Sequence, residues 1–296
     1  MRPFKNILFL WLISLLIPAC APGPREPIAR QEVTQEKTLT RSGIEIASIF
    51  YESEGQKMEA FTFRPVGSGP FPGLVLVHPH SDVREGAALF VRVGRGERLA
   101  LQRYAVFAIS QPGYGRSEGK PDYVGPRTVK GVLDGIEYFR NLPYVDKERI
   151  GLWGYSRGAM VAALAATKTK AIKAVVLVAG AYDFKKFYES TGLEGIRRNI
   201  SWEAGTSKKA FYERSAINFL DELAAPVLIL HGNRDINVPV DQAYILRDAL
   251  TKLGKPFELF IFPNYDHFLP PSEVWQYSLT FFDKYLKAGS PRSPEG

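Results

Sequence analysis

The segment 154–158 constrains the fold of this chain more than any other, because it reads Gly-Tyr-Ser-Arg-Gly and so has the pattern G-x-S-x-G. The short apolar run 149–153 precedes it, and the alanine-rich run 159–166, a good helix former, follows it. Strand, sharp turn and helix in this order are the context in which such a serine stands exposed as a nucleophile. A glycine and serine turn before an ordinary helix is the alternative for the bare pattern, and the flanking runs favour the nucleophile.

The glycines, the serine and the residue after it have separate physical roles in such a turn. A serine at the tip of a tight turn sits in strained backbone, and side chains at Gly154 and Gly158 would collide with neighbouring elements. The turn also places the backbone N–H of Arg157 at a helix N-terminus, where it can face a developing negative charge. Ser156 is therefore a candidate nucleophile, and the Arg157 N–H is a candidate oxyanion donor.

Alternating strand and helix patterns predict the fold class. Near-continuous apolar runs, typical of strands covered on both faces, occur at 73–77, 106–109, 172–178, 226–230 and 257–262. Between or after them, apolar residues with helical spacing occur at 129–139, 241–253 and 273–286. This alternation predicts an α/β fold with a mostly parallel central sheet flanked by helices. Two earlier β-prone runs, 44–51 and 58–63, predict a hairpin at a sheet edge.

One connection is much longer than the others. It joins the predicted strand that ends near Ala179 to the one that starts at Pro226, and it is rich in aromatic and basic residues. A loop of this length usually contains helices of its own. We expect a small helical cap over the site, at about 181–224, inserted before the penultimate strand. A surface excursion without a role in substrate binding is the alternative.

The N-terminal residues have the features of an export signal. Two basic residues precede the apolar run 7–17, which is too short to span a membrane comfortably. The tetrapeptide 17–20, Ile-Pro-Ala-Cys, resembles the lipobox of bacterial lipoprotein precursors, and Cys20 is the only cysteine of the chain. We expect 1–19 to be a lipoprotein-type signal peptide and Cys20 to carry a lipid that anchors the protein in the bacterial cell envelope. An ordinary signal peptide that contains a cysteine is the alternative.

Composition sets the remaining domain limits. The segment 20–43 is rich in Pro, Gly, Glu and Gln and predicts a flexible tether, the α/β domain is expected at 44–288, and 289–296 is expected to be a disordered tail. The formal net charge of the chain is +7, but the basic residues are spread out rather than clustered. Since a nucleic-acid partner would need a basic stripe, none is expected.

A serine hydroxyl needs a base within hydrogen-bond reach, and the base needs an acid that orients it. Ligands in this type of sheet bind beyond the carboxyl ends of the strands. Each histidine of the chain could lie at that edge: His78, His80, His231 and His267. Chain order separates them, because Ser156, Asp235 and His267 occur in the order nucleophile, acid, base.

Other residues offer alternative assignments. Asp183 could be the acid, whereas Asp266 is interpreted as a turn or surface residue and His231 as a structural residue at a strand end. The pair at 78–80, His-Pro-His, lacks a clear third ligand, so no metal is expected. The Gly-Tyr-Gly turn at 113–115 lacks the rest of a dinucleotide fingerprint, so no cofactor is expected.

Several segments together resemble a known superfamily. They are 76–80, 111–117, 154–158, 215–219, 231–239 and 265–267. In these segments, and over about residues 44–288, the chain resembles the α/β-hydrolases. More narrowly it is similar to the dienelactone hydrolase and prolyl oligopeptidase (S9) catalytic-domain branch.

The resemblance implies roles for individual residues. The nucleophile, the general base and the orienting carboxylate would be Ser156, His267 and Asp235. One oxyanion donor would be the N–H of Arg157. The second would be the N–H of His80, because Pro79, which stands where the family often has glycine, has no N–H.

We therefore expect a serine hydrolase that acts on a small-molecule ester. Short peptides are the second expectation, because the S9 resemblance is strong. A catalytically silent binding lipoprotein on a hydrolase scaffold is the alternative from a different class, since fold does not imply activity.

Overall fold

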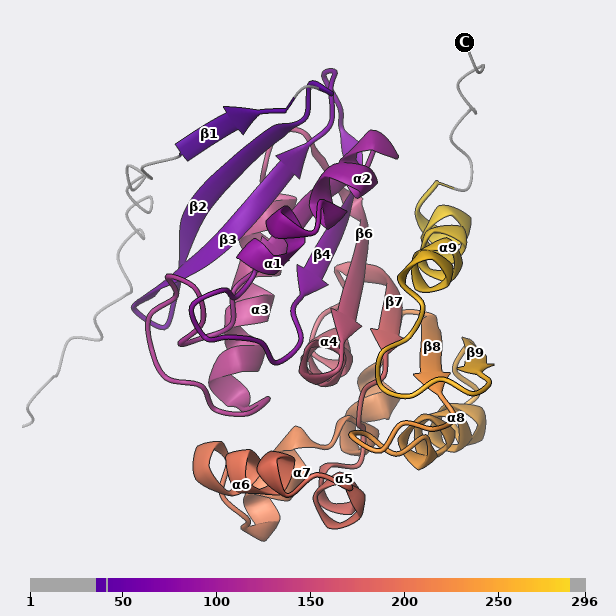
Figure 1. The fold of residues 1–296 in the computed structure, drawn as a ribbon. Coiled ribbons are helices and arrows are strands. Elements are labelled where there is room, and N and C mark those ends of the chain that lie inside the picture. The colour runs from indigo at the N-terminus through magenta and orange to yellow at the C-terminus, as the bar shows by residue number, and fades with distance from the viewer. Residues whose placement is uncertain (1–35, 41, 288–296) are drawn as a thin grey trace, which may run out of the picture. The chain divides into compact units, whose positions relative to one another are not determined.

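The computed structural model describes residues 36–40 and 42–287 of the 296-residue chain (Figure 1). A sheet with the order β1-β2-β3-β5-β4-β6-β7-β8-β9 forms its centre. The strands are β1 (Glu36–Leu39), β2 (Glu45–Ser53), β3 (Gln56–Arg64), β4 (Phe71–Val77), β5 (Ala105–Ile109), β6 (Val145–Tyr155), β7 (Ile172–Val178), β8 (Val227–Gly232) and β9 (Phe257–Phe262). The pairs from β5 to β9 are parallel, and the first three pairs are antiparallel. The prediction of a mostly parallel sheet is confirmed.

The antiparallel end of the sheet differs from the prediction in one respect. Strands β2 and β3 form the expected hairpin, with Ser53 opposite Gln56. Both turn residues, Glu54 and Gly55, have positive φ (50° and 75°), as a two-residue turn of primed type requires. The hairpin is not at the sheet edge, however, because β1 pairs with the outer side of β2. The prediction of a flexible tether was wrong at 36–39, because these residues form strand β1. The backbone N–H and C=O groups on the outer side of β2 would otherwise be unpaired, and β1 pairs with them.

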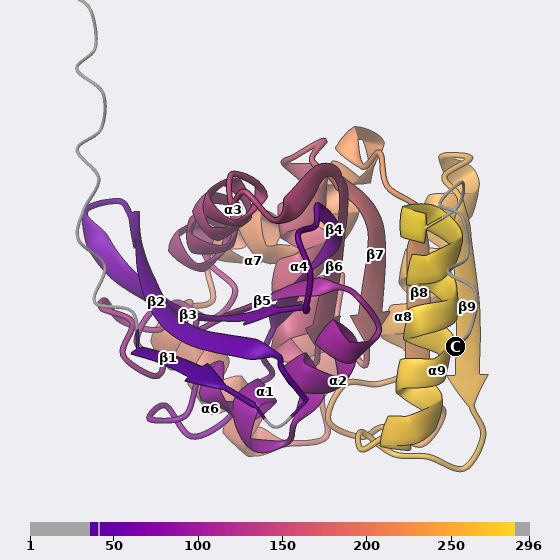
Figure 2. The same ribbon diagram turned by 90° about the horizontal axis from the view of Figure 1, so that it is seen from above.

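Helices cover both faces of the sheet (Figure 2). One face packs against α3 (Pro126–Arg140), α4 (Arg157–Thr167) and α8 (Asp241–Lys252). The other packs against α1 (Ala88–Arg92), α2 (Arg95–Leu101) and α9 (Pro271–Phe282), and a π-helical turn follows at Asp283–Lys287. The sequence patterns predicted α3, α4, α8 and α9 but not the two short helices α1 and α2.

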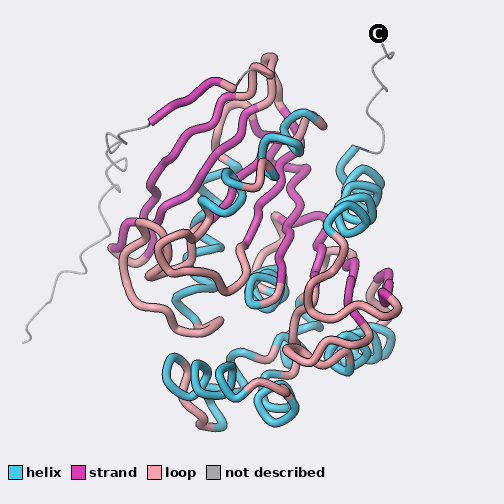
Figure 3. Tube along the Cα trace, in the orientation of Figure 1, coloured by secondary structure: helices cyan, strands magenta, loops and turns pink. Residues whose placement is uncertain are grey.

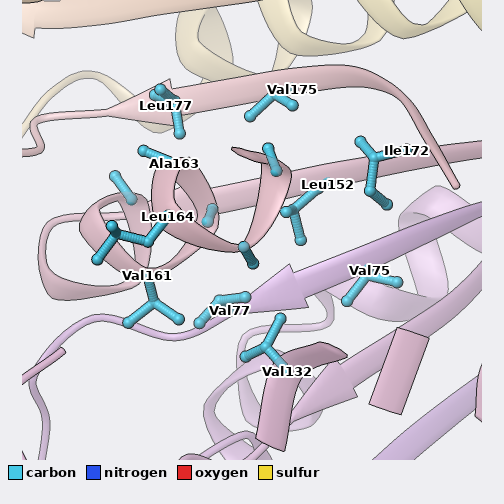
Figure 4. Close-up of a cluster of buried hydrophobic side chains, with 14 of the residues drawn as sticks. Val75, Val77, Val132, Leu152, Val161, Ala163, Leu164, Ile172, Val175 and Leu177 are labelled. Carbon is cyan, nitrogen blue, oxygen red and sulfur yellow. The ribbon is translucent and has the colours of Figure 1, made fainter. Parts of the chain in front are cut away.

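Strand β4 shows why both faces are apolar. Its side chains alternate, so that Val75 and Val77 lie in one core and Leu74 and Leu76 in the other. Figure 4 shows the first of these cores, where Val161 of α4 packs beside Val77. Two buried faces on one strand produce the near-continuous apolar run that the sequence displays.

The predicted cap lies between β7 and the penultimate strand β8. It contains α5 (Phe184–Ser190), α6 (Glu194–Glu203), α7 (Lys208–Arg214) and a 3₁₀ helix (Ala216–Glu222), drawn as helices below the sheet in Figure 3. Side chains start two of these helices: Asp183 accepts from the Lys186 N–H (3.0 Å), and Ser207 accepts from the Ala210 N–H (3.1 Å). The predicted fold with its cap is confirmed.

The expected signal peptide at 1–19, the lipid-bearing Cys20 and the tail at 289–296 lie outside the described residues. Within 36–40 and 42–287, none of the helices combines the length and the apolar character needed to cross a bilayer.

Candidate active site

The turn between β6 and α4 has the strained geometry that the sequence pattern predicts. Ser156 has φ 54° and ψ −121°, a conformation that costs energy for any residue with a side chain. Its own N–H donates to the carbonyl of Val178 in β7 (2.8 Å), which fixes the tip of the turn to the neighbouring strand. Since Arg157 is the first residue of α4, its N–H has no intrahelical acceptor and faces outward from the helix N-terminus.

The two glycines of the motif are required by close backbone contacts. A Cβ at Gly154 would lie 2.3 Å from the carbonyl oxygen of Gly158, and a Cβ at Gly158 would lie 2.2 Å from the carbonyl oxygen of Val77 in β4. Both distances are far shorter than non-bonded carbon–oxygen contacts in proteins. The glycines therefore allow α4 to start directly against the sheet, and Ser156 is exposed at the tip as a result.

Three side chains from separate loops meet at this turn. The Ser156 hydroxyl donates to Nε2 of His267 (2.9 Å), and Nδ1–H of His267 donates to Oδ2 of Asp235 (2.7 Å). His267 lies between β9 and α9, and Asp235 lies just after β8. The structure thus brings together the three residues that the sequence singled out, in the relative positions of nucleophile, base and acid.

Asp235 is held as a buried carboxylate. Its Oδ1 accepts from the backbone N–H groups of Asn237 (2.9 Å) and Val238 (2.8 Å). Burial alone would raise its pKa, but hydrogen bonds from His231 and His267 outweigh burial and hold the pKa of Asp235 at about 2. The charge is therefore present over the whole physiological range, where it can orient His267 and stabilise its protonated form.

The alternative acids have other partners. Asp183 caps α5, and Asp266 accepts from the backbone N–H of Phe268 (2.8 Å). His231 is buried, as expected of a structural residue, and its Nε2–H donates to the carbonyl of Val238 (2.8 Å). Its Nε2 also lies 3.4 Å from Oδ2 of Asp235, so His231 supports the acid, which the sequence did not suggest.

An aromatic stack supports His267. The ring of Tyr155 stacks on the His267 ring (centroids 5.6 Å apart, planes at 22°), and its hydroxyl donates to the His267 carbonyl. Below Tyr155, Trp153 stacks on Trp275 of α9 (4.6 Å, 22°). The exposed ring of Phe268 also meets the His267 ring, edge to face (5.8 Å). These contacts restrict the orientation of the imidazole before substrate arrives.

The side chain of Arg157 joins the turn to the cap. It is buried, and its guanidinium donates to Glu203 of α6 (3.1 Å) and to the hydroxyl of Tyr114 (2.9 Å), and it lies over the ring of Tyr123 (4.0 Å). Sequence reasoning assigned a role only to the backbone of Arg157. No local pattern relates residues 157 and 203, because a pair this far apart is set by tertiary packing.

The same hydrogen bonds reach His80. Arginine only donates, so the Tyr114 oxygen accepts from Arg157, and the Tyr114 hydroxyl is also hydrogen bonded to Nδ1 of His80 (2.8 Å). Desolvation and the charge of Arg157 lower the pKa of His80 to about 4, so the ring is neutral at physiological pH.

The backbone of His80 matters for the second oxyanion donor. Within residues 36–40 and 42–287, its N–H donates to no acceptor, so this group is available to an incoming oxygen. His78, in contrast, is fully committed: its Nδ1–H donates to the Pro79 carbonyl (2.7 Å), and its Nε2 accepts from the Gln111 N–H (3.0 Å). Among the described residues, no group of three His, Cys, Asp or Glu side chains could hold a metal ion.

The sheet order, the strained serine and the three hydrogen-bonded side chains define a serine hydrolase of the α/β-hydrolase fold. The chain belongs to the prolyl oligopeptidase family, peptidase family S9, whose model matches residues 117–289. The resemblance drawn from the sequence is therefore confirmed.

Individual comparisons agree with this assignment. The uncharacterized peptidase YtmA of Bacillus subtilis is 30% identical over 78% of this chain and 89% of its own length. The acylaminoacyl peptidase of Pyrococcus horikoshii superposes with a TM-score of 0.70 at 22% identity, over 85% of this chain and 43% of that one. The acetyl xylan esterase of Paenibacillus sp. R4 superposes with a TM-score of 0.67 at 19% identity, over 86% of this chain and 89% of that one. These two structures share the fold of this chain.

Proposed function

We propose that this protein hydrolyses carboxylic esters through an acyl-enzyme formed on Ser156. The observation that carries the proposal is the unbroken hydrogen-bond chain from the Ser156 hydroxyl through His267 to Asp235, at 2.9 and 2.7 Å. A hydroxyl that already donates to a neutral imidazole nitrogen can lose its proton as it attacks a carbonyl carbon.

In the first half-reaction, the Ser156 oxygen attacks the ester carbonyl and Nε2 of His267 accepts its proton. Asp235, held as a carboxylate, stabilises the imidazolium that forms. The carbonyl oxygen becomes an oxyanion, to which the backbone N–H groups of Arg157 and His80 would donate. His267 then protonates the leaving alkoxide, the carbon–oxygen bond breaks, and the alcohol departs.

In the second half-reaction, water takes the place of the alcohol. His267 removes a proton from the water as its oxygen attacks the acyl carbon, and the same two N–H groups stabilise the second tetrahedral intermediate. Return of the proton from His267 to the Ser156 oxygen releases the carboxylic acid and restores the resting site.

An apolar rim around the triad supports esters with an apolar or aryl acyl group. Phe268 and Ile236 each follow a triad residue directly, and they are 72% and 63% exposed. The Phe268 ring meets the His267 ring edge to face (5.8 Å), and Ile236 adds exposed apolar surface next to Asp235 in the chain, so both are candidates to contact an acyl group. Short peptides are the second candidate substrate, since YtmA is named as a peptidase and this chain covers most of its length.

Labelling and turnover together test the proposal. The full chain is treated with a fluorophosphonate and digested, and we expect the label on Ser156 in the wild type and no label in Ser156→Ala. A panel of p-nitrophenyl esters and aminoacyl p-nitroanilides then ranks the two substrate classes, and we expect faster turnover of the esters. Label at another residue refutes the nucleophile. A folded wild type that turns over neither class supports a catalytically silent binding protein instead.

We also propose that the protein acts at the bacterial cell envelope, anchored by a lipid on Cys20. The support is the basic and apolar N-terminal sequence that ends in the lipobox-like tetrapeptide 17–20. Expression with labelled palmitate should give a labelled, membrane-associated wild type and an unlabelled Cys20→Ser variant. Equal labelling of the two, or none of the wild type, rejects the anchor but leaves the hydrolytic proposal unaffected.

A further inference from the structure

A cavity of about 390 Å³ lies between helices α2 and α9, on the sheet face opposite α3, α4 and α8. Its walls include Arg95 and Arg98 from α2 and Trp275 and Leu279 from α9. None of the three triad residues lines it, and neither do Arg157 or His80. It is therefore a separate site from the one described above, and its walls combine positive charge with apolar surface.

The two arginines of the cavity have no acidic partner among residues 36–40 and 42–287. The guanidinium of Arg95 lies 4.2 Å from the centre of the Trp275 ring, and the Arg98 guanidinium donates to the Val93 carbonyl, at 3.4 Å. Among the residues that the structure describes, no carboxylate forms an ion pair with either one. Arginines nearby behave differently, since Arg84 and Arg92 each form an ion pair at 2.7 Å or less.

Two like charges one helical turn apart repel each other, and the partial burial of one increases the cost. Burial, followed by the charge of Arg98, lowers the pKa of Arg95 to about 10, which leaves it protonated at neutral pH. An anion in the cavity would neutralise the pair. A planar guanidinium also suits carboxylate or phosphate oxygens, which it can bind with two hydrogen bonds at once.

The start of helix α9 adds to this charge. Pro271 and Ser272, its first two residues, line the cavity, and no side chain caps this end of the helix. The positive end of a helix of this length favours a nearby anion. Helix α2, through its two arginines, and helix α9, through its N-terminus, thus both present positive charge to the cavity.

The rest of the wall is apolar except for Gln102. Leu101 and Leu279 supply alkyl surface, and Leu101 is 51% exposed. The Trp275 ring is buried and already packs against Trp153 and the Arg95 guanidinium. The geometry points to a binding site for a small amphiphilic anion, with a carboxylate or phosphate head against Arg95 and Arg98 and an apolar body against Leu101 and Leu279. A volume of about 390 Å³ is at the lower end of ligand sites in proteins, which are typically about 300–1,000 Å³.

Calorimetry on the full chain tests this site. Sodium octanoate and octyl phosphate serve as anionic probes, octanol serves as the neutral probe of equal chain length, and vesicles with phosphatidylglycerol serve as the bilayer probe. The decisive variant is Arg98→Gln, because this exposed side chain can be changed without disturbing the core. Arg95→Gln is measured as a second single variant. The matched control is Arg140→Gln, which removes one positive charge from α3 on the other face.

We expect one molecule of each soluble anion to bind per chain. Affinity should fall roughly tenfold in Arg98→Gln and in Arg95→Gln, the size of one lost charge-assisted hydrogen bond, and stay unchanged in Arg140→Gln. Octanol should bind at least tenfold more weakly than octanoate. The site is refuted when neither anion binds saturably, or when Arg98→Gln binds as tightly as the wild type. Binding to vesicles without binding of the soluble anions also refutes it, and assigns this face to a bilayer.

Discussion

The ion pair between Arg157 and Glu203 offers the sharpest test of how the cap is attached to the site. Replacement of Glu203 by Ala removes the carboxylate that Arg157 contacts at 3.1 Å and leaves the guanidinium buried among Tyr114 and Tyr123. The same carboxylate accepts from the backbone N–H of Tyr123 (3.1 Å), so the substitution also leaves that donor without its partner.

The expected cost follows from burial. The side chains of Arg157 and Glu203 are 4% and 14% exposed, so water does not replace the lost carboxylate well. Removing one partner of a buried pair typically costs about 3–5 kcal/mol. The hydroxyl of Tyr114 still accepts from Arg157, which places the expected loss of unfolding free energy near the lower end, at about 3 kcal/mol.

Urea denaturation of the full chain measures this loss. The control is Glu189→Ala, which breaks the i,i+4 pair with Lys185 on the same cap, where both side chains are more than half exposed (65% and 58%). An exposed pair of this kind is worth about 0–1 kcal/mol. If Glu203→Ala lowers the free energy of unfolding by no more than Glu189→Ala does, water reaches the Arg157 guanidinium and the argument from burial fails.

Three further outcomes are expected. Gly158→Ala places a methyl group 2.2 Å from the Val77 carbonyl oxygen and should cost about 3 kcal/mol or more in thermal or urea unfolding; a variant of wild-type stability contradicts the close contact. Asp235→Asn should keep the fold but lower kcat by roughly 10⁴-fold, because the amide no longer fixes the tautomer and charge of His267; near-normal kcat in ester assays refutes this. Burial lowers the pKa of His78 in the folded protein to about 4, below its value of about 6.5 in the unfolded chain. As the pH falls, the unfolded chain therefore protonates His78 before the folded protein does, and the folded state loses stability from about pH 6.5 down to about pH 4. Between about pH 7 and pH 5, urea titrations of the wild type should show a loss about 2 kcal/mol greater than those of His78→Asn, and parallel losses would contradict a neutral buried His78.

The parts of the site that the sequence predicts are those with local or ordered signals. The strand, turn and helix around Ser156 lie within one short stretch, so pattern and propensity agree there. Asp235 and His267 follow predicted strands in a fixed chain order, and parallel strands bring their carboxyl ends to one edge. These signals were sufficient to select three side chains that prove to be hydrogen bonded to one another.

The sequence could not predict features that depend on packing between distant segments. Strand β1 is a short run in a polar segment, and only the free edge of β2 makes it a strand. Helices α1 and α2 are too short to show a clear helical period, so the cavity between α2 and α9 had no sequence signal. The contact of Arg157 with Glu203 likewise depends on where α6 docks, which no local rule decides.

That contact bears on the role of the cap. A cap that served only as a surface excursion would leave the residue after the nucleophile free, yet Glu203 of α6 binds the Arg157 side chain inside the protein. Lifting α6 away would separate the buried ion pair and the hydrogen bond from the Tyr123 N–H to the same carboxylate. We therefore expect substrate to reach Ser156 along the exposed rim of Phe268 and Ile236 while α6 stays in place. On this reasoning the cap is a fixed wall of the site, and its stability and the geometry of the nucleophile's helix depend on the same pair of charges.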